Sequence, residues 1–197
     1  GANRFIKRAW SIVWQLSEGA QAGDFDYTKL DGQAAELFRT LNGLGTRCTA
    51  DYDRGQFNTA ISAVMEIVNA ASKYLIETPA DERNHELDYR VAHDIVAILA
   101  PICPHWAEEL YHEALHLTGS VYNEPWPEFD VELSRADTVE IAVQVMGKVR
   151  ARVNVAADAS REDLEKAALE AVASQIEGKT VRKVVVVPGK LVNVVAN

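Results

Sequence analysis

The chain has 197 residues, of which 48% are hydrophobic and 25% charged, and its formal net charge is -9 at pH 7. This composition is typical of folded globular proteins and excludes an intrinsically disordered chain. No apolar run reaches the roughly 18 residues of a membrane-spanning helix and the two cysteines fit no disulfide framework, so we expect a cytoplasmic protein that does not enter a membrane.

Four segments have apolar residues at helical spacing and are predicted to form helices: Arg4–Glu18, Leu30–Leu44, Phe57–Leu75 and Leu87–Leu117. Gly43 and Gly45 are expected to end the second helix. Pro101 and Pro104 are expected to split the last segment into two helices, because proline removes a backbone donor and clashes with the preceding turn. These patterns predict an all-α helical bundle over residues 1–117.

Residues 118–137 have no apolar period of either kind and contain glycine, prolines and several acids. This composition predicts a connector between two domains. Trp126 lies between Pro125 and Pro127, and we expect its ring to pin the connector onto one of the domains.

Residues 138–197 have the pattern of a small ββαββ domain, which makes the whole chain α+β. Alternating apolar residues predict one hairpin that turns at Met146–Lys148, and a second hairpin around Pro188-Gly189. Ser160 and Asp163 have the spacing of a capping box, which predicts the start of the helix between the hairpins.

The charge is distributed unevenly between these two parts. From Thr138 onward there are nine Lys and Arg against seven Asp and Glu, a net charge of +2, whereas the preceding residues carry -11. Charges separated by more than a Debye length of about 8 Å at physiological salt are largely screened from one another. The acidic total therefore does not exclude a polyanionic partner for the C-terminal part.

The basic residues of the first hairpin are the candidate binding residues. Lys148, Arg150 and Arg152 lie two apart, so on a regular strand their side chains project from one face while Val149 and Ala151 turn to the core. Four further cations could extend this basic face: Lys179, Arg182, Lys183 and Lys190. An alternative stays open, because lysine and arginine on strands also serve solubility and protect sheet edges.

A second motif suggests different chemistry. His112-Glu113 and His116 form an H-E-x-x-H sequence, the spacing that places two imidazoles on one helical face to hold zinc, with the glutamate as general base. No third ligand is evident in the sequence, and on a helix both histidines also lie on an arc that could be a solvated face. A zinc hydrolase is therefore an alternative interpretation.

Several segments resemble one known family. The strings VEIAVQVMGKVR (139–150) and EGKTVRKVVVVPGKLVNVV (177–195) resemble the C-terminal end of bacterial leucyl-tRNA synthetases. The strings RFIKRAW (4–10) and LAPICPHWAEELY (99–111) are similar to the helical domain of class I synthetases. One departure is Met146, where the family usually has asparagine in the hairpin turn.

The resemblance implies a helical, anticodon-binding-type bundle (1–117), a connector (118–137) and a C-terminal tRNA-binding domain (138–197). The parent would be a monomeric, ATP- and Mg²⁺-dependent leucine-tRNA ligase, and the "HIGH" and "KMSKS" signatures of its catalytic domain do not occur in these residues. The expected partners are tRNA(Leu) and the catalytic and editing domains of the same parent chain. This chain itself would be non-catalytic, with no cofactor of its own.

The resemblance also implies which residues contact tRNA. It assigns this role to seven of the nine cations of residues 138–197 and to a second basic cluster at the start of the first helix. The seven are Lys148, Arg150, Arg152, Lys179, Arg182, Lys183 and Lys190, and the second cluster is Arg4, Lys7 and Arg8. The contacts are expected to go mostly to phosphate and ribose rather than to base edges. A protein-interaction module without nucleic-acid binding remains a further alternative.

Overall fold

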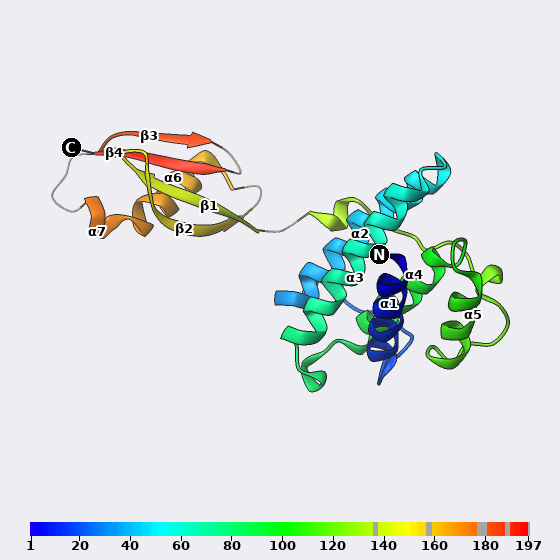
Figure 1. Ribbon diagram of the computed structural model, residues 1–197. Coiled ribbons are helices and arrows are strands. Elements are labelled where there is room, and N and C mark those ends of the chain that lie inside the picture. The colour runs from blue at the N-terminus through cyan, green and yellow to red at the C-terminus, as the bar shows by residue number, and fades with distance from the viewer. Residues whose placement is uncertain (136–137, 157–158, 177–180, 188–189, 197) are drawn as a thin grey trace. The chain divides into compact units, whose positions relative to one another are not determined.

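The structure is a computed structural model of residues 1–197, and it describes all of them except 136–137, 157–158, 177–180, 188–189 and 197. The chain divides into two compact units, Gly1–Arg135 and Ala136–Asn197, and each is described by itself (Figure 1). Within the described ranges, no helix has both the length and the apolar character needed to cross a bilayer.

The first unit is the predicted helical bundle. It contains α1 (Ala2–Ser17), α2 (Gly32–Asp53), α3 (Phe57–Glu77), α4 (His85–Leu99) and α5 (Pro104–Glu113). Four short 3-10 turns connect or follow them: η1 (Tyr27–Lys29), η2 (Ala80–Glu82), η3 (Val121–Asn123) and η4 (Glu132–Ser134).

The apolar stripes predicted from spacing form the core of the bundle. The buried face of α1 consists of Ala9, Ile12, Val13 and Leu16. Helix α4 is the most enclosed, because its buried residues run without interruption from Asp94 to Leu99. The break between α4 and α5 occurs where the two prolines predict it, and Pro104 is the first residue of α5.

Helix α2 is longer than predicted. The expected stop at Gly43 and Gly45 is wrong, because the helix continues to Asp53. These glycines do not end the helix but leave room for another segment. A Cβ atom on Gly45 would overlap the Phe129 ring, and one on Gly43 would lie 2.9 Å from the Ser134 Cβ. The cost of glycine in a helix is thus offset by the close approach of another segment.

That segment is residues 121–135, which we call the strap. The sequence assigns it to the connector, but it is part of the first unit: its beginning packs against α4 and α5, and its later residues pack along α2. Trp126 Nε1 donates a hydrogen bond to Thr49 Oγ1 at 2.9 Å, so its predicted pinning role is confirmed. The backbone N–H of Asp130 donates to Oδ1 of the buried Asn42 at 3.1 Å.

The second unit is a four-stranded sheet with helices. Its elements are β1 (Thr138–Val145), β2 (Lys148–Ala156), α6 (Arg161–Ala171), α7 (Ala173–Ile176), β3 (Val181–Val187) and β4 (Leu191–Ala196). The strand order is β2-β1-β4-β3, with β1 and β4 parallel at the centre and the two hairpins antiparallel. The edge strands are therefore β2 and β3.

Helix α6 covers one face of this sheet, and its predicted capping box is confirmed: Ser160 and Asp163 each bond the backbone N–H of the other. Beneath the helix lies a small core of aliphatic side chains: Ile141, Val143, Val145, Val155, Leu164, Ala168, Val172, Val192 and Val194. The fold is α+β, as predicted. The edge strands carry five of the candidate binding residues: Lys148, Arg150, Arg152, Arg182 and Lys183.

Candidate nucleic-acid interface

Strand β2 contains a β-bulge at Arg150. Val143 on β1 pairs with Ala151, and the next residue, Gln144, pairs with Val149, so Arg150 is one residue more than the ladder needs. A bulge leaves the extra residue unpaired, bends the strand and re-aims the side chains around it.

Because of the bulge, the prediction that Lys148, Arg150 and Arg152 project from one face of the sheet is wrong. Beyond it the alternation reverses: Lys148 pairs with the buried Val145, whereas Arg152 pairs with Ala142 on the opposite side of the sheet. Val149, which the alternation predicts in the core, is 54% exposed. Strict alternation holds only for an unbroken ladder, and nothing in the β2 sequence itself marks the interruption.

Strand β3 contains a second bulge. Val181 pairs with Ala196 and Lys183 pairs with Val195, so Arg182 is the extra residue. Lys183 shares the outer face with Val195, away from α6, and both cations are exposed. Lys179 lies outside the described residues.

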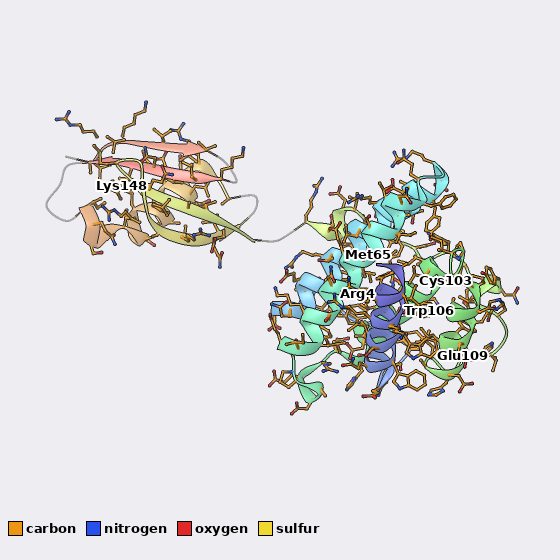
Figure 2. The ribbon with its side chains drawn as sticks, viewed as in Figure 1. Arg4, Met65, Cys103, Trp106, Glu109 and Lys148 are labelled. Atoms are coloured by element: carbon orange, nitrogen blue, oxygen red, sulfur yellow. The ribbon has the colours of Figure 1, made fainter. Side chains whose placement is uncertain are left out.

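Strand pairing brings Lys148, Arg150, Arg182 and Lys183 toward one end of the sheet. Val145 at the end of β1 pairs with Val194, which pairs with Val184 on β3. The beginnings of β2 and β3 therefore lie at the same end, next to the turn between β1 and β2, where Lys148 is labelled in Figure 2. Lys190 precedes β4 and lies toward the other end, because its carbonyl accepts a hydrogen bond from Ala142 N–H.

Most of these cations have no acidic partner. Within the part of the chain that the structure describes, five of them form no ion pair: Lys148, Arg150, Arg182, Lys183 and Lys190. Arg152 differs, because its Nη1 lies 2.7 Å from Glu140 Oε1 across the hairpin. An exposed pair of this kind contributes little to stability. It nevertheless competes with an external phosphate for the guanidinium.

The turn between β1 and β2 is tight and strained at one residue. Met146 has a φ of 52° and Gly147 a φ of 78°, and positive values at both central residues define a type I′ turn. Gly147 N–H donates to the Asn193 side-chain oxygen at 3.1 Å, which ties the turn to β4. Methionine is disfavoured in the left-handed conformation, so this turn lowers the stability of the sheet unit.

The sheet unit has no aromatic side chain. The last phenylalanine, tyrosine or tryptophan of the sequence is Phe129, and the last histidine is His116. Base stacking on an aromatic ring is therefore not available to residues 136–197. Its exposed lysines and arginines are suited to contacts with phosphate and ribose.

The second predicted cluster lies on α1 in the bundle. Arg4 and Arg8 are exposed, lie one turn apart and line a cleft of about 420 Å³ together with Met65 and Asn69 of α3. Figure 2 labels Arg4 and Met65 on their two helices. Lys7 is also exposed, but it does not line this cleft. The structure thus brings two of the three cations together at one site.

The H-E-x-x-H motif does not form a zinc site. Helix α5 ends at Glu113, and His116 lies beyond it with a φ of 55°, so the two imidazoles do not share a helical face. His112 Nδ1 is 3.0 Å from the carbonyl oxygen of Leu117. In the described parts of the chain, no group of three or more His, Cys, Asp or Glu side chains could hold a metal ion. The zinc-hydrolase alternative is wrong.

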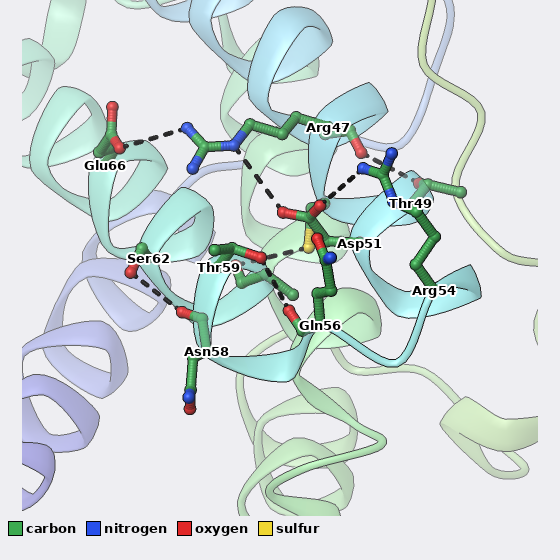
Figure 3. A network of polar contacts seen from close by, with 12 residues as sticks. Arg47, Thr49, Asp51, Arg54, Gln56, Asn58, Thr59, Ser62 and Glu66 are labelled. Atoms are coloured by element: carbon green, nitrogen blue, oxygen red, sulfur yellow. Dashed lines mark hydrogen bonds and ion pairs between the residues drawn. The ribbon is translucent and has the colours of Figure 1, made fainter.

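One polar network in the bundle escaped the sequence analysis. Asp51 of α2 is 4% exposed and meets the guanidinium of Arg54 at 2.9 Å and that of Arg47 at 3.8 Å, while Arg47 also reaches Glu66 of α3 (Figure 3). The Thr59 side chain and the two arginines lower the pKa of the Asp51 carboxyl. The network ties α2 to α3 at their connecting turn, a structural role that a charged residue in an apolar stripe could have signalled.

Comparison with known proteins identifies the family of this chain. A family model described as "Anticodon-binding domain of tRNA ligase" matches residues 34–167, which is more than half of the chain. Among solved structures, LeuRS in a ternary complex with tRNA and LeuAMS, from Agrobacterium radiobacter K84, is similar in fold, with a TM-score of 0.64 and 22% identity. The match covers 98% of this chain but only 24% of that one. The chain belongs to the anticodon-binding domain family of tRNA ligases.

Proposed function

We propose that this chain is the non-catalytic, tRNA-binding C-terminal part of a leucine-tRNA ligase. Its role is to position tRNA(Leu) for aminoacylation by a catalytic domain elsewhere in the parent protein, in the cytoplasm. ATP and Mg²⁺ belong to that parent reaction, and the catalytic and editing domains are its other partners. Family membership supports the ligase assignment, and the shared fold with LeuRS bound to tRNA supports leucine as the amino acid.

One observation carries the proposal: the edge strands of the sheet unit present cations that lack acidic partners among the described residues. A guanidinium or ammonium group without an internal carboxylate is available to an external anion. Phosphates are the anions that RNA offers in closely spaced rows. These cations lie in the part of the chain with a net positive charge, whereas the acidic residues dominate the bundle.

The composition of this surface indicates how it would recognise RNA. It has no aromatic ring on which splayed bases could stack, and its charged side chains suit phosphate and ribose. Such contacts fix the position and orientation of the RNA and carry no direct sequence information. The proposed unit would therefore hold the tRNA body, and discrimination by base identity would come from other parts of the enzyme.

The cleft between α1 and α3 is a second proposed contact. Arg4 and Arg8 could bind phosphate oxygens there, and the side-chain amide of Asn69 could donate a hydrogen bond to the same backbone. Lys7 would add to the local positive potential next to the cleft. The bundle as a whole is acidic, so this contact depends on short-range pairing rather than on long-range attraction.

The experiment replaces Lys148, Arg150 and Arg152 by alanine in the parent enzyme. Affinity for tRNA(Leu) should fall and its salt dependence should flatten, because fewer phosphate contacts release fewer counterions. Leucine-dependent pyrophosphate exchange, which requires no tRNA, should persist. A matched control replaces Arg161 and Lys166 on α6, which also removes positive charge from the same unit. Unchanged tRNA affinity in the triple variant would contradict the assignment.

A protein-interaction role remains the second candidate, and one observation favours it. On the sheet face away from α6, three valines are exposed: Val149 at 54%, Val185 at 37% and Val187 at 39%. The two candidates predict different results in a tRNA titration. Only the nucleic-acid role predicts binding that weakens steeply with salt.

A further inference from the structure

Both edge strands of the sheet are bulged, and in both the extra residue is an arginine. Arg150 is the unpaired residue of β2 and Arg182 that of β3. The central strands β1 and β4 pair with each other without interruption from Ala142 to Val145. The interruptions are thus confined to the two edges.

Each bulge has a second cation close by. Lys148 lies two residues before Arg150, and Lys183 directly follows Arg182. All four side chains are exposed, and within the described residues none of them forms an ion pair. Each edge strand therefore carries its own pair of cations, and the positive charge does not form a continuous row along one strand.

Strand geometry gives the span between these points. Three strand spacings of about 4.8 Å separate the edges, roughly 14 Å in all. Along the strands, Arg182 lies about three residues closer to the turn end than Arg150, or roughly 10 Å. The two backbone positions are therefore on the order of 17 Å apart, several times the rise of about 3.4 Å per nucleotide along one strand of a double helix.

We propose that Arg150 and Arg182 form a two-point grip on the backbone of a folded RNA, with each arginine on a different phosphate several nucleotides apart or on different strands. This inference rests on the proposed function and adds the geometry of recognition. The bulges take both arginines out of the ladder, so each side chain is aimed independently of the strand alternation. A rigid sheet between them fixes the span, so the grip selects a folded RNA surface over a short flexible strand.

Protection of the sheet edges is the competing explanation for the bulges. Bulges and positive charges both discourage edge-to-edge pairing between molecules. That role requires no RNA and no fixed span between the arginines. It predicts that loss of the bulges promotes self-association, whereas the grip predicts that loss of either arginine weakens RNA binding.

The test measures tRNA(Leu) affinity of the full 197-residue chain and of Arg150→Gln, Arg182→Gln and the double variant, across a range of salt. We expect each single variant to bind about tenfold more weakly and the double variant about a hundredfold, with the salt slope reduced by about 1 and about 2. Lys166→Gln on α6 is the matched control and should change the affinity less than about twofold.

A second variant separates the bulge from its charge. Deleting Arg150 and replacing Val149 by arginine restores a regular ladder while the net charge stays the same. The grip predicts that this variant binds as weakly as Arg150→Gln. Circular dichroism checks that it folds, and if it does not, the glutamine variants still decide the matter.

The outcomes separate the two levels of the proposal. If the wild-type chain binds tRNA and the double glutamine variant binds equally well, the grip is overturned and the proposed function stands. The grip is also overturned if the regular-ladder variant binds like wild type, or if the glutamine variants only self-associate in sedimentation. If the wild-type chain binds no tRNA, both proposals are overturned.

Discussion

The two units of the chain differ in what holds them together. The bundle has 135 residues and contains every aromatic ring of the protein, and its core includes the fully buried Tyr74 and Tyr111. The sheet unit has 62 residues, packs only aliphatic side chains and leaves several valines exposed. Because small domains bury a smaller fraction of their surface, we expect the sheet unit to be the less stable of the two.

The two units also differ in where they place their charged residues. The bundle is acidic, and Asp51, Asp88 and Asp94 are buried in its interior. The sheet unit is basic, and within the described residues Lys148, Arg150, Arg182, Lys183 and Lys190 form no ion pair. All four tryptophans lie in the bundle, so their fluorescence reports on that unit alone. The two units can therefore be followed separately in one chain.

The largest expected effect tests whether the bundle unfolds independently. Ile67 is fully buried in α3, and Ile67→Ala should lower the bundle's free energy of unfolding by about 2–5 kcal/mol through lost packing and a cavity. Urea titration followed by tryptophan fluorescence measures this change. The valine methyl signals of the sheet unit should keep their own transition, and a parallel loss in both units would contradict independent folding.

The next effect concerns a buried carboxyl. Burial raises the pKa of Asp88 from 3.8 to about 6, against the opposing contributions of Tyr74, Arg83 and His85 around it. The native state then binds the proton more tightly than the unfolded chain. The bundle's stability should therefore fall as pH rises from about 4 to about 6 and stay low above that, by about 3 kcal/mol.

Asp88→Asn tests this explanation. The substitution removes the charge that burial disfavours, so it should raise the bundle's stability at pH 7 by up to about 3 kcal/mol and abolish the decline between pH 4 and 6. Urea titrations at several pH values, followed by tryptophan fluorescence, measure both results. A variant that retains the wild-type pH profile would assign the dependence to another group.

A smaller effect tests the strap. Gly45→Ala would place a methyl group against the Phe129 ring, and we expect a loss of about 1–3 kcal/mol together with faster proteolysis within residues 121–135. Gly23→Ala is the matched control, because its added Cβ would meet only Glu86 Cγ at an ordinary 3.6 Å. Equal cleavage rates in the two variants would show that the strap does not depend on the room that Gly45 leaves.

The smallest effect is a gain in the sheet unit. Met146 is left-handed in a type I′ turn, where asparagine is favoured, so Met146→Asn should stabilise the sheet unit by about 1 kcal/mol. Hydrogen exchange of the β1 and β2 amides measures the gain. Met146→Leu keeps the strain and should show no gain. If both substitutions behave alike, the turn conformation is not the source of the cost.

The sequence predicted the features that depend on local chemistry. Apolar spacing located α1 and α3, the prolines placed the break between α4 and α5, and the capping box of α6 was read from Ser160 and Asp163. Each of these signals acts within a few residues, so no distant partner is needed to interpret it. The free state expected for Cys48 and Cys103 is confirmed as well.

The features that the sequence did not predict depend on a distant partner. Local rules predict that Gly43 and Gly45 end α2. Instead the helix continues, and Phe129 and Ser134 pack against the two glycines. Strand alternation predicts that the cations of β2 lie on one face, but the pairing of β2 with β1 contains a bulge at Arg150. His112 and His116 matched a zinc motif only while both were assumed to be helical. In each case a tertiary contact or the end of a helix changed the structure that the local pattern predicts.

The most direct test of the central claim is the affinity of the chain for tRNA(Leu) as a function of salt concentration. The claim is that unpaired cations of the sheet unit hold the ribose-phosphate backbone. With five such cations and a contribution of about 0.7–0.9 each, the logarithm of the binding constant should fall with the logarithm of salt concentration with a slope of about -4. Affinity that does not change with salt, or no binding at about 50 mM salt, would contradict the claim.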